Sequence, residues 1–534
     1  MLVCLNLYLE GYKNPIVLGT LDALNSKRSD YMADFEKHPL LKPEKIESRL
    51  YQKNIVNSVL KRGNSLIILP TALGKTIIAV ILSAHALCDS ADSKVLIVSP
   101  TKPLAMQHYE TFKSALELPE QDFILLTGSI KMDERPDLWE NARVISATPQ
   151  TIRNDLKKGK ITLDKVSLLI VDESHHSVKS YSYVDVARLY VEQSKKPLII
   201  GLTASPSIEK IKEVSKNLYI KNIETRTEQD EDVIPYIQKK EIERVFVELP
   251  QEFQEIRTIL RTYMDTIFQK LKDVNLVYST SMRKGDILKL QKSLISSKNF
   301  HGIILTTALI KAWYAVEMLE TQGISSLHTY FEKIKNDTRR TSVKLTKDLK
   351  RAMELADALY NGGREHPKIE RLKEVLANEL EKNPDVQGII FAHFRNSAQN
   401  IINAIENVPG VRPVRFVGQA SKQGDIGLSQ DEQKQIIEDF RNKEYNFLVC
   451  TSVGEEGLDI PSVDVVVFYE PVPSEIRKIQ REGRTGRKRA GKVVVLITKK
   501  TMDESRYWAS HYKQKRMREA LEDMKKPQKT LDQW

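Results

Sequence analysis

The sequence predicts an α/β protein with two parallel-sheet domains and a mainly helical insert domain between them. Short apolar runs alternate with amphipathic stretches over residues 46–224, and the same alternation returns over residues 366–510. Residues 225–365 lack this alternation and carry apolar residues at helical spacing. Parallel strands are apolar throughout because helices cover both faces of their sheet, so the two alternating regions predict parallel sheets.

Each predicted element comes from one such run. The strands expected in the first sheet are Ser65–Leu69, Lys94–Ser99, Val144–Ala147, Leu168–Val171 and Leu198–Leu202. The insert helices are expected at Glu252–Lys272, Met282–Ser297 and Ile303–Leu319. The second sheet is expected to contain Gly388–Phe391, Val414–Val417, Phe447–Cys450, Val463–Tyr469 and Lys492–Ile497. Residues 1–45 form an N-terminal extension, in which Met32 is an alternative start that would leave residues 1–31 untranslated, and residues 511–534 form a basic tail.

Length and composition indicate a multidomain globular protein. A chain of 534 residues is too long for one hydrophobic core, and 41% hydrophobic with 29% charged residues is an ordinary mixture. The net charge of +11 is compatible with a polyanionic partner, although it is moderate for this length. Cys4, Cys88 and Cys450 have no disulfide-type or zinc-type spacing, which suits a reducing compartment. No apolar run reaches the roughly 18 residues that a transmembrane helix needs.

A phosphate-binding loop is predicted at the end of the first strand. Pro70–Thr76 follows an apolar run and opens a helix, so backbone N–H groups at the helix N-terminus would point at phosphates. Within Gly74-Lys75-Thr76, the lysine supplies a positive charge and the threonine can bind magnesium. The loop departs from the full pattern at its first position, where Leu69 replaces a glycine.

Two carboxylates are predicted at the same edge of the sheet. Asp172 and Glu173 directly follow an apolar strand, and ligand sites in open α/β sheets form at the carboxyl ends of strands. Asp172 can hold magnesium, while Glu173 can orient or deprotonate an attacking water. Capping of the next helix is the alternative role for this pair, and the phosphate-binding loop upstream favours the first interpretation.

A pair of arginines far downstream completes the pattern. Gln480–Arg487 places Arg484 and Arg487 three residues apart on one face of a helical turn. Two guanidiniums so placed can reach phosphoryl oxygens on a neighbouring domain, which predicts two domains that close on one nucleotide. By itself the segment could be a solvated basic loop. Ahead of the phosphate loop, Arg49-Leu-Tyr-Gln52 offers an amide that can contact an adenine edge.

Further motifs in the same order carry a family resemblance. They are Pro100–Pro103, Ala147–Pro149, Thr203–Ser205, Phe416–Ala420, Gly427–Gln433, Thr451–Pro461 and Tyr469–Pro473. Together with the segments above they closely resemble superfamily-two helicases, and in particular the archaeal Hef family, relatives of the FANCM and Mph branched-DNA translocases. The resemblance covers residues 46–510 and implies two RecA-like helicase domains around a helical insert, with ATP and Mg²⁺ as cofactors.

The resemblance also implies a role for each motif residue. Nucleotide contacts are implied for Arg49, Gln52, Gly74, Lys75, Thr76, Gly457 and Asp459, with Thr76 and Asp172 at magnesium. Catalysis is implied for Lys75, Asp172, Glu173, Gln480, Arg484 and Arg487, and coupling between domains for His175, Thr203 and Ser205. Nucleic-acid contacts are implied for Thr101, Lys102, Thr127, Gly128, Thr148, Arg395 and Thr451. Ser174 stands where the family commonly has alanine, and hydrolysis is still expected.

The implied function is an ATP-dependent DNA helicase or translocase that acts on forked or branched DNA in replication-fork repair and moves 3′ to 5′. Contacts to phosphates carry no sequence information, so binding is expected to be sequence-independent and salt-sensitive. The helical insert is the candidate for shape preference. Two alternatives remain open: an RNA-directed translocase of the RIG-I-like kind, and a non-hydrolysing scaffold that binds branched DNA.

The chain ends suggest partners. Full-length Hef-type proteins often continue into an XPF-like nuclease, whose Glu-Arg-Lys-x-x-x-Asp signature is absent here, so a separate nuclease is a candidate partner. Gln528, Leu531 and Trp534 have a spacing that resembles the peptide by which replication proteins bind the sliding clamp PCNA. A frayed polar tail is the alternative. No membrane partner is expected, and the implied location is cytoplasmic, at the nucleoid of an archaeal-type cell.

Overall fold

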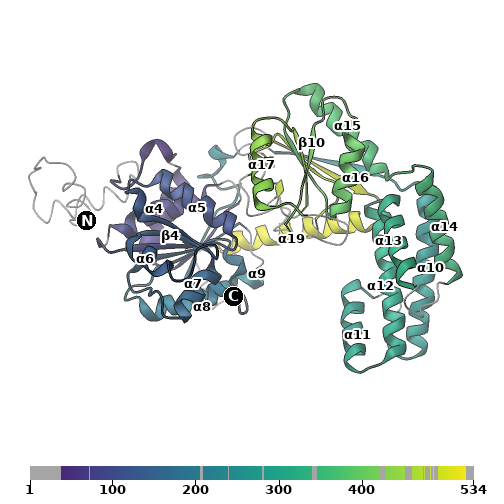
Figure 1. Cartoon of the computed structure of the whole chain (residues 1–534), viewed down its shortest axis with the longest axis horizontal. Helices are drawn as coiled ribbons and strands as arrows, with labels where there is room; N and C mark the ends of the chain where they lie inside the picture. The colour runs from purple at the N-terminus through teal and green to yellow at the C-terminus, as the bar shows by residue number, and fades with distance from the viewer. Residues whose placement is uncertain are drawn as a thin grey trace, which may run out of the picture.

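Two parallel sheets and one helical bundle build the protein, whose structure is a computed structural model (Figure 1). The structure describes residues 38–47, 49–70, 73–88, 90–204, 208–237, 240–279, 282–338, 346–419, 427–451, 460–472, 474, 481–482, 485 and 491–524. In this described part, the first sheet lies toward the N-terminus, the second sheet lies beside it, and the bundle extends from the second sheet (Figure 1).

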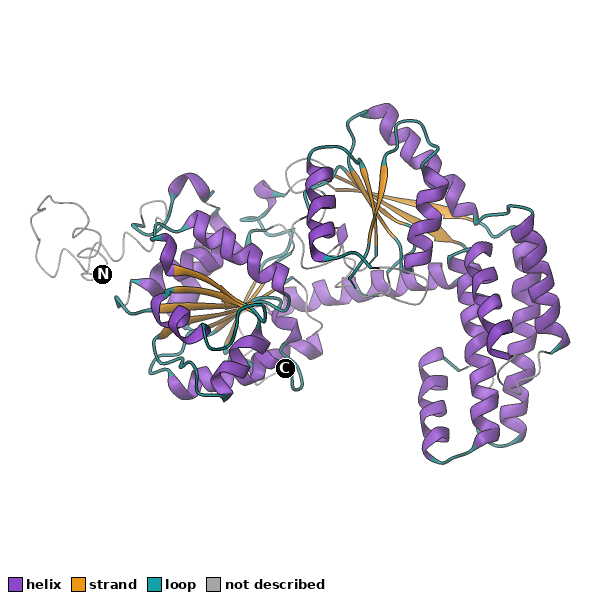
Figure 2. Cartoon of the chain, viewed as in Figure 1, coloured by secondary structure: helices purple, strands orange, loops and turns teal. Residues whose placement is uncertain are grey.

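The first domain contains a seven-stranded parallel sheet with the order β3-β4-β2-β5-β6-β1-β7. Its strands are β1 (Ser65–Ile68), β2 (Lys94–Val98), β3 (Phe123–Leu126), β4 (Val144–Ala147), β5 (Val166–Val171), β6 (Ile199–Thr203) and β7 (Asn222–Thr225). Its helices are α3 (Leu50–Arg62), α4 (Lys75–Leu87), α5 (Lys102–Ala115), α6 (Arg135–Asn141), α7 (Pro149–Lys157), α8 (Ser182–Gln193) and α9 (Ile208–Asn217). Helices cover both faces of this sheet (Figure 2), which explains why its central strands are buried along their whole length.

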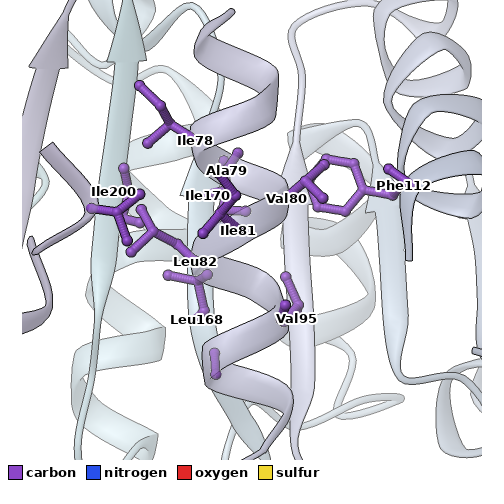
Figure 3. Close-up of a cluster of buried hydrophobic side chains, with 14 of the residues drawn as sticks. Ile78, Ala79, Val80, Ile81, Leu82, Val95, Phe112, Leu168, Ile170 and Ile200 are labelled. Carbon is purple, nitrogen blue, oxygen red and sulfur yellow. The ribbon is translucent and has the colours of Figure 1, made fainter. Parts of the chain in front are cut away.

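The face covered by α4 forms one hydrophobic core. Figure 3 shows Ile81 of α4 beside Ile170 of the sheet and Val80 of α4 beside Phe112 of α5, with Ile200 of the sheet on the side opposite Phe112. All five side chains are fully buried. This packing fixes the start of α4 at the carboxyl edge of the sheet, where the phosphate-binding loop was predicted.

The second domain contains a six-stranded parallel sheet with the order β10-β11-β9-β12-β13-β8. Its strands are β8 (Lys240–Val247), β9 (Gly388–Phe391), β10 (Pro413–Phe416), β11 (Phe447–Cys450), β12 (Val465–Phe468) and β13 (Gly491–Thr498). Its described helices are α15 (Pro367–Lys382), α16 (Arg395–Ile405) and α17 (Gln430–Arg441). The predicted fold class, two parallel-sheet domains with a helical domain between them, is confirmed.

The insert is a bundle of long helices. They are α10 (Gln251–Asp273), α11 (Lys284–Ser296), α12 (Phe300–Thr321), α13 (Ile324–Thr338) and α14 (Lys347–Asn361). With a mean hydropathy of 1.4, α12 is long and apolar enough to cross a membrane by length and composition alone. In the structure it packs against α10, α11 and α13, so its apolar character is that of a central bundle helix.

Several segments differ from the expected organisation. Residues 240–247 lie within the region predicted as the insert, yet they form β8, the edge strand that pairs in parallel with β13. The strand is largely exposed, so its sequence lacks the continuous apolar run by which buried strands are recognised. The segments β3 and β7 were not predicted either, and both are edge strands of the first sheet.

A single C-terminal helix, α19 (Met502–Met524), replaces the expected division between the second domain and a tail at residue 510. Its N-terminal part carries Tyr507, which packs in the core of the second domain. Its C-terminal part carries Met517 and Leu521, which pack in the core of the first domain. The helix, yellow in Figure 1, therefore connects the two sheet domains after the chain has already passed through both.

Candidate nucleotide and nucleic-acid site

The described site residues of the first domain gather at the carboxyl ends of its strands. Lys75 and Thr76 follow β1, Thr101 and Lys102 follow β2, Thr127 and Gly128 follow β3, Thr148 follows β4, Asp172 and Glu173 follow β5, and Thr203 ends β6. Parallel strands bring these ends to one edge of the sheet, so residues far apart in sequence become neighbours.

Lys75 contacts the backbone at the start of the predicted phosphate-binding loop. Gly74 is the N-cap of α4 and has a φ of +66°, a left-handed conformation that glycine adopts without strain. The Lys75 ammonium donates to the backbone carbonyl of Leu69 at 3.1 Å and to that of Pro70 at 3.4 Å. The lysine therefore lies inside the loop, with its charge at the N-terminus of α4, where phosphates bind.

Gln52 contacts this loop from α3. Its side chain is 2% exposed, and a Cβ placed on Gly74 would lie 2.5 Å from its Nε2. Its Oε1 is buried without a hydrogen-bond partner in the described part of the chain. Next to it, the hydroxyl of Tyr51 donates to the carbonyl of Leu73 at 2.8 Å, which ties α3 to the loop. An unpaired amide oxygen at this position fits the amino group of adenine.

Arg49 lies at the entrance to the same region. Its Nη2 donates to Glu47 at 2.7 Å, and its guanidinium lies 5.3 Å from the centre of the Tyr236 ring. Because it caps the start of α3, it stands on the same helix as Gln52. Its charge can therefore approach a nucleotide only by rearrangement of these two contacts.

Asp172 has a partner that the sequence did not indicate. His108 of α5 places Nε2 2.8 Å from its Oδ2, and the hydroxyl of Tyr183 donates to its backbone carbonyl at 2.8 Å. Burial acts to raise the pKa of Asp172, but the attraction and hydrogen bond of His108, with help from Lys75, hold this pKa below its usual value. The carboxylate is therefore ionised and held in place from two sides.

Glu173 and His175 converge with Thr203. Glu173 has a left-handed backbone, with a φ of +44°, and is followed by one turn of 3₁₀ helix, Ser174–His176. This turn places His175 Nδ1 3.2 Å from a carboxylate oxygen of Glu173 and 3.3 Å from the hydroxyl of Thr203. A non-glycine residue in this conformation stores on the order of 1 kcal/mol or more, a cost often found at functional sites.

Ser174 fits its position because of a glycine on the neighbouring strand. The serine is fully buried, and a Cβ placed on Gly201 of β6 would lie 3.1 Å from its Oγ. Glycine at position 201 therefore leaves the space that the hydroxyl occupies.

The oxygen atoms at this edge suit Mg²⁺. The ion prefers hard oxygen ligands, one or two from the protein and the rest from water and phosphate. Asp172 provides an ionised carboxylate and Thr76 provides a hydroxyl at the start of α4. These two residues would hold the ion beside the phosphate-binding loop.

The predicted nucleic-acid contacts of the first domain begin two helices and one loop. Thr101 is an exposed N-cap of α5, and Thr148 is the N-cap of α7. Gly128 is exposed, with open space around its Cα. Thr127 differs, because it is 2% exposed and its hydroxyl shares a hydrogen bond with Ser129 at 2.7 Å. Thr127 therefore shapes the loop, while its neighbours are open to solvent.

Arg135 supports two of these contacts and was missed in the sequence. Its guanidinium donates to the carbonyl of Ile130 at 2.7 and 3.0 Å and to both oxygens of buried Asp155, at 2.9 and 3.2 Å. Ile130 ends the loop that carries Gly128, and Asp155 lies on α7, which begins at Thr148. One arginine thus joins two segments that are predicted to contact nucleic acid. Neither its spacing nor its surroundings in sequence identified it.

In the second domain, the described candidates also follow parallel strands. Arg395 begins α16 after β9, and its Nη2 donates to the carbonyl of Gly418, after β10, at 2.8 Å. Thr451 follows β11, and its backbone N–H donates to Phe416 at 3.4 Å. The structure therefore brings Arg395 and Thr451 to one sheet edge.

Several predicted residues lie outside the described part of the chain. They are Ser205, Gly457, Asp459, Gln480, Arg484, Arg487, Gln528, Leu531 and Trp534. Two described neighbours show how the arginine segment is anchored. The guanidinium of Arg481 lies 4.6 Å from the centre of the Phe391 ring, and the hydroxyl of Thr485 donates to the carbonyl of Val463 at 2.5 Å.

Three family descriptions match the three structural blocks. Residues 49–214 match "DEAD/DEAH box helicase", residues 367–489 match "Helicase conserved C-terminal domain", and residues 252–361 match "Putative ATP-dependent RNA helicase, helical bundle". The solved structure of the Hef helicase domain of Pyrococcus furiosus is 42% identical, with a TM-score of 0.70. The match covers 88% of this chain and 100% of that one. The chain belongs to the Hef helicase family.

Curated relatives of this Hef-family chain are longer. A protein of Methanocaldococcus jannaschii named "Putative ATP-dependent RNA helicase" is 40% identical over 92% of the chain, which spans 63% of that protein. The ATP-dependent DNA helicase fml1 of Schizosaccharomyces pombe is 32% identical over 86% of the chain, which spans 58% of it. The chain therefore spans about three fifths of the length of these two relatives.

Proposed function

We propose that this Hef-family chain is an ATP-hydrolysing motor that moves 3′ to 5′ on DNA and remodels forked or branched DNA during replication-fork repair. The observation that carries the proposal is the convergence of Lys75, Asp172 and Glu173 at one sheet edge, beside the exposed helix cap Thr101 and the half-buried cap Thr148. A motor needs a nucleotide site and a strand site on the same domain edge, and this arrangement supplies both.

Each first-domain residue has its own role in ATP binding and hydrolysis. Gln52 binds the adenine edge through its unpaired Oε1, and Lys75 leaves its loop carbonyls to contact the β- and γ-phosphates. Glu173 orients the attacking water and receives its proton. Bound Mg²⁺ neutralises phosphate charge. His175 contacts both Glu173 and Thr203, so it couples the state of the nucleotide to the end of β6.

Translocation follows from closure of the two domains. Arg484 and Arg487 reach the nucleotide from the second domain and stabilise the charge that develops on the phosphoryl group. Closure moves Arg395 and Thr451 of the second domain relative to the helix caps Thr101 and Thr148 of the first domain. Repeated closing and opening then advances the protein along one strand through contacts to phosphates.

The charge at the far end of the bundle supports branched DNA as the substrate. It carries more basic than acidic side chains on its exposed surface. The exposed basic residues near the α10–α12 turns are Lys270, Lys272, Arg283, Lys289, Lys292 and Lys298, against Asp273 and Asp286. A basic surface at a distance from the strand site can hold the duplex arm of a fork.

An RNA-directed motor is a second candidate. The observation that favours it is the similarity to the M. jannaschii protein and to the bundle family, both described as RNA helicases. A fungal relative and an animal relative are named DNA helicases, and these names favour DNA.

ATP hydrolysis with different nucleic acids tests the proposal. Forked DNA, linear duplex, single-stranded DNA and single-stranded RNA are compared for the wild type, Lys75→Ala and Glu173→Gln. We expect the fork to stimulate hydrolysis most strongly, and both variants to lose at least about a hundredfold in kcat. Stronger stimulation by RNA would favour the second candidate. Tight fork binding without hydrolysis would favour a non-hydrolysing scaffold.

The proposal also includes two protein partners, a sliding clamp and a nuclease. The sliding clamp PCNA would bind Gln528, Leu531 and Trp534, and a separate nuclease would cut the branched DNA that this chain remodels. Such a protein works at the nucleoid. Deletion of residues 527–534 should abolish clamp binding and leave hydrolysis unchanged. Unchanged clamp affinity after the deletion would remove PCNA from the proposal.

A further inference from the structure

The insert joins the second domain through a junction of buried polar side chains. The junction lies where α12 ends, against the loop that follows β9 and the first turn of α16. Gln322 is 5% exposed there, and Ser397 and Glu470 are each 3% exposed. Buried polar groups keep hydrogen bonds, so the partners of these three residues define how the insert is held.

Glu470 bridges the insert and a loop of the second domain. It follows β12, and its Oε2 accepts a hydrogen bond from the backbone N–H of His393 at 2.6 Å. Its Oε1 accepts a hydrogen bond from the Nε2 of Gln322, the residue that caps the C-terminus of α12. One carboxylate therefore contacts both the central helix of the insert and the loop two residues before Arg395.

Gln322 makes a second connection to the same part of the second domain. Its Oε1 accepts a hydrogen bond from the hydroxyl of Ser397, in the first turn of α16. Arg395, which begins α16, holds the carbonyl of Gly418 at 2.8 Å. The loop and the helix turn on either side of Arg395 are thus both tied to the end of α12.

The base of the junction is rigid. The ammonium of Lys368, on α15, contacts the carbonyl of Thr321 at 3.4 Å and pairs with Asp503 at the start of α19. Lys368 and Asp503 are both fully buried. Close packing at this base transmits displacement because the interior has no space in which to absorb it.

We propose that Glu470 is a positioning residue that couples the helical insert to the strand-binding loop of the second domain. Displacement of α12 when DNA engages the bundle passes through Gln322 and Glu470 to the backbone of His393, and so sets the position of Arg395. This inference rests on the proposed function, because it requires a nucleic-acid strand at Arg395 and DNA on the insert.

The chemistry of the bridge predicts which substitutions preserve it. Glutamine at position 470 can accept the His393 N–H with its carbonyl oxygen. Its amide group can donate to Gln322 Oε1 if the Gln322 amide turns over, and the Gln322 amide then donates to Ser397. Leucine removes both acceptor oxygens and leaves the His393 N–H without this partner. Glu470→Gln should therefore keep the coupling, whereas Glu470→Leu should lose it.

A neighbouring contact provides a matched control. The hydroxyl of Ser325, at the start of α13, donates to Glu365, just before α15. This bond also joins the insert to the second domain, but neither partner contacts the loop near Arg395 in the described part of the chain. Ser325→Ala therefore removes an exposed hydrogen bond between the insert and the second domain and leaves the buried bridge intact.

The experiment compares the wild type with Gln322→Ala, Glu470→Gln, Glu470→Leu and Ser325→Ala. The first measurement is the ratio of kcat for ATP hydrolysis on forked DNA to kcat on single-stranded DNA. The second is amide hydrogen exchange of the 392–397 segment, which needs no activity. We expect Gln322→Ala to lower the ratio at least about threefold, to keep hydrolysis on single strands and to speed exchange in this segment. Glu470→Leu should in addition raise the KM for single-stranded DNA.

The outcomes separate this inference from the proposed function. Loss of stability alone would lower hydrolysis on both DNAs together and leave the ratio unchanged. An unchanged ratio and unchanged exchange in Gln322→Ala, or equal behaviour of Glu470→Gln and Glu470→Leu, would overturn the coupling. If no nucleic acid stimulates the wild type, the proposed function fails. Exchange in Gln322→Ala then decides whether the bridge to His393 exists.

Discussion

His108 Nε2 lies 2.8 Å from Oδ2 of Asp172, and both side chains are at least 90% buried. The histidine comes from α5, whose N-cap Thr101 is predicted to contact nucleic acid, and the aspartate follows β5 beside the predicted phosphate-binding loop. The contact therefore joins a predicted nucleic-acid-binding helix to the carboxylate predicted to hold magnesium. It also gives the buried charge of Asp172 a partner.

Replacing His108 by alanine should destabilise the protein by about 3 kcal/mol, because Asp172 would then be a buried carboxylate without its partner. Urea unfolding measures this loss. Asp172→Asn in the same background removes the charge and should recover part of the stability. Fully additive losses in the double variant would contradict the pairing.

Gly74→Ala should weaken nucleotide binding at least about tenfold, because a methyl group at this left-handed position would meet Nε2 of Gln52 at 2.5 Å. A fluorescent ATP analogue measures the affinity. Gly159→Ala is the matched control, since Gly159 has a similar φ of +64° but has open space around it. Both variants should lose about 1 kcal/mol of stability. Equal nucleotide affinities would show that Gln52 does not contact the loop.

Arg135→Met should lower stability by about 3 kcal/mol and weaken the binding of single-stranded DNA several-fold. The substitution leaves Asp155 buried without its partner and releases the carbonyl of Ile130, which ends the loop of Gly128. Urea unfolding and a salt titration of DNA affinity measure the two effects.

Lys160→Ala serves as the control for Arg135, since the pair between Lys160 and Asp133 is exposed on the same side of the domain. Surface pairs of this kind contribute at most about 1 kcal/mol. Tight DNA binding that survives Arg135→Met would mean that the loop and α7 are positioned independently.

The stability of the protein should depend on pH through Glu470. Burial raises the pKa of this carboxyl from 4.5 to about 7, with Lys368 opposing the rise and Asp503 adding to it. The folded state therefore binds this proton more tightly than the unfolded state. The contribution of Glu470 to stability falls as pH rises from 4.5 to about 7, by on the order of 3 kcal/mol, and is level above that.

Glu470→Gln removes this titration, so the variant should gain stability relative to the wild type as pH rises from 5 to 8. Urea unfolding of both proteins across this range measures the difference. Burial lowers the pKa of His38 to about 3 and that of His85 to about 4. In both proteins these histidines make the free energy of unfolding rise with pH at low pH, opposite to the effect of Glu470. Subtraction cancels that slope. A constant difference between the two proteins would show that Glu470 titrates normally.

Motif spacing predicted which first-domain residues gather at the carboxyl edge of the sheet, for a local reason. Asp172 and Glu173 directly follow one continuous apolar strand, and Lys75 begins the helix after another, so the sequence alone indicates the sheet edge to which they belong. Strand β8 was missed because an exposed edge strand has no such run. The insert helices were predicted because Phe253, Ile256 and Leu260 repeat at helical spacing.

The partners of these motif residues could not be predicted in the same way. His108 and Arg135 are a histidine and an arginine on amphipathic helices, where such residues usually face solvent. Only the packing of α5 against the sheet places His108 over the end of β5, and only the fold places Asp155 beside Arg135. Side-chain contacts across elements depend on relative helix positions, which sequence periodicity does not specify.

The sequence by itself therefore determined the order of the domains, the strands that carry the motifs and the chemistry at the carboxyl edge. Those features depend on local patterns, because strand polarity and hydrophobic period are properties of a few consecutive residues. The tertiary structure alone decided that α19 returns to the first domain and that Glu470 joins the insert to the loop before Arg395. Both arise from burial between segments that are distant in sequence, where shape and unpaired hydrogen-bonding groups select the partner.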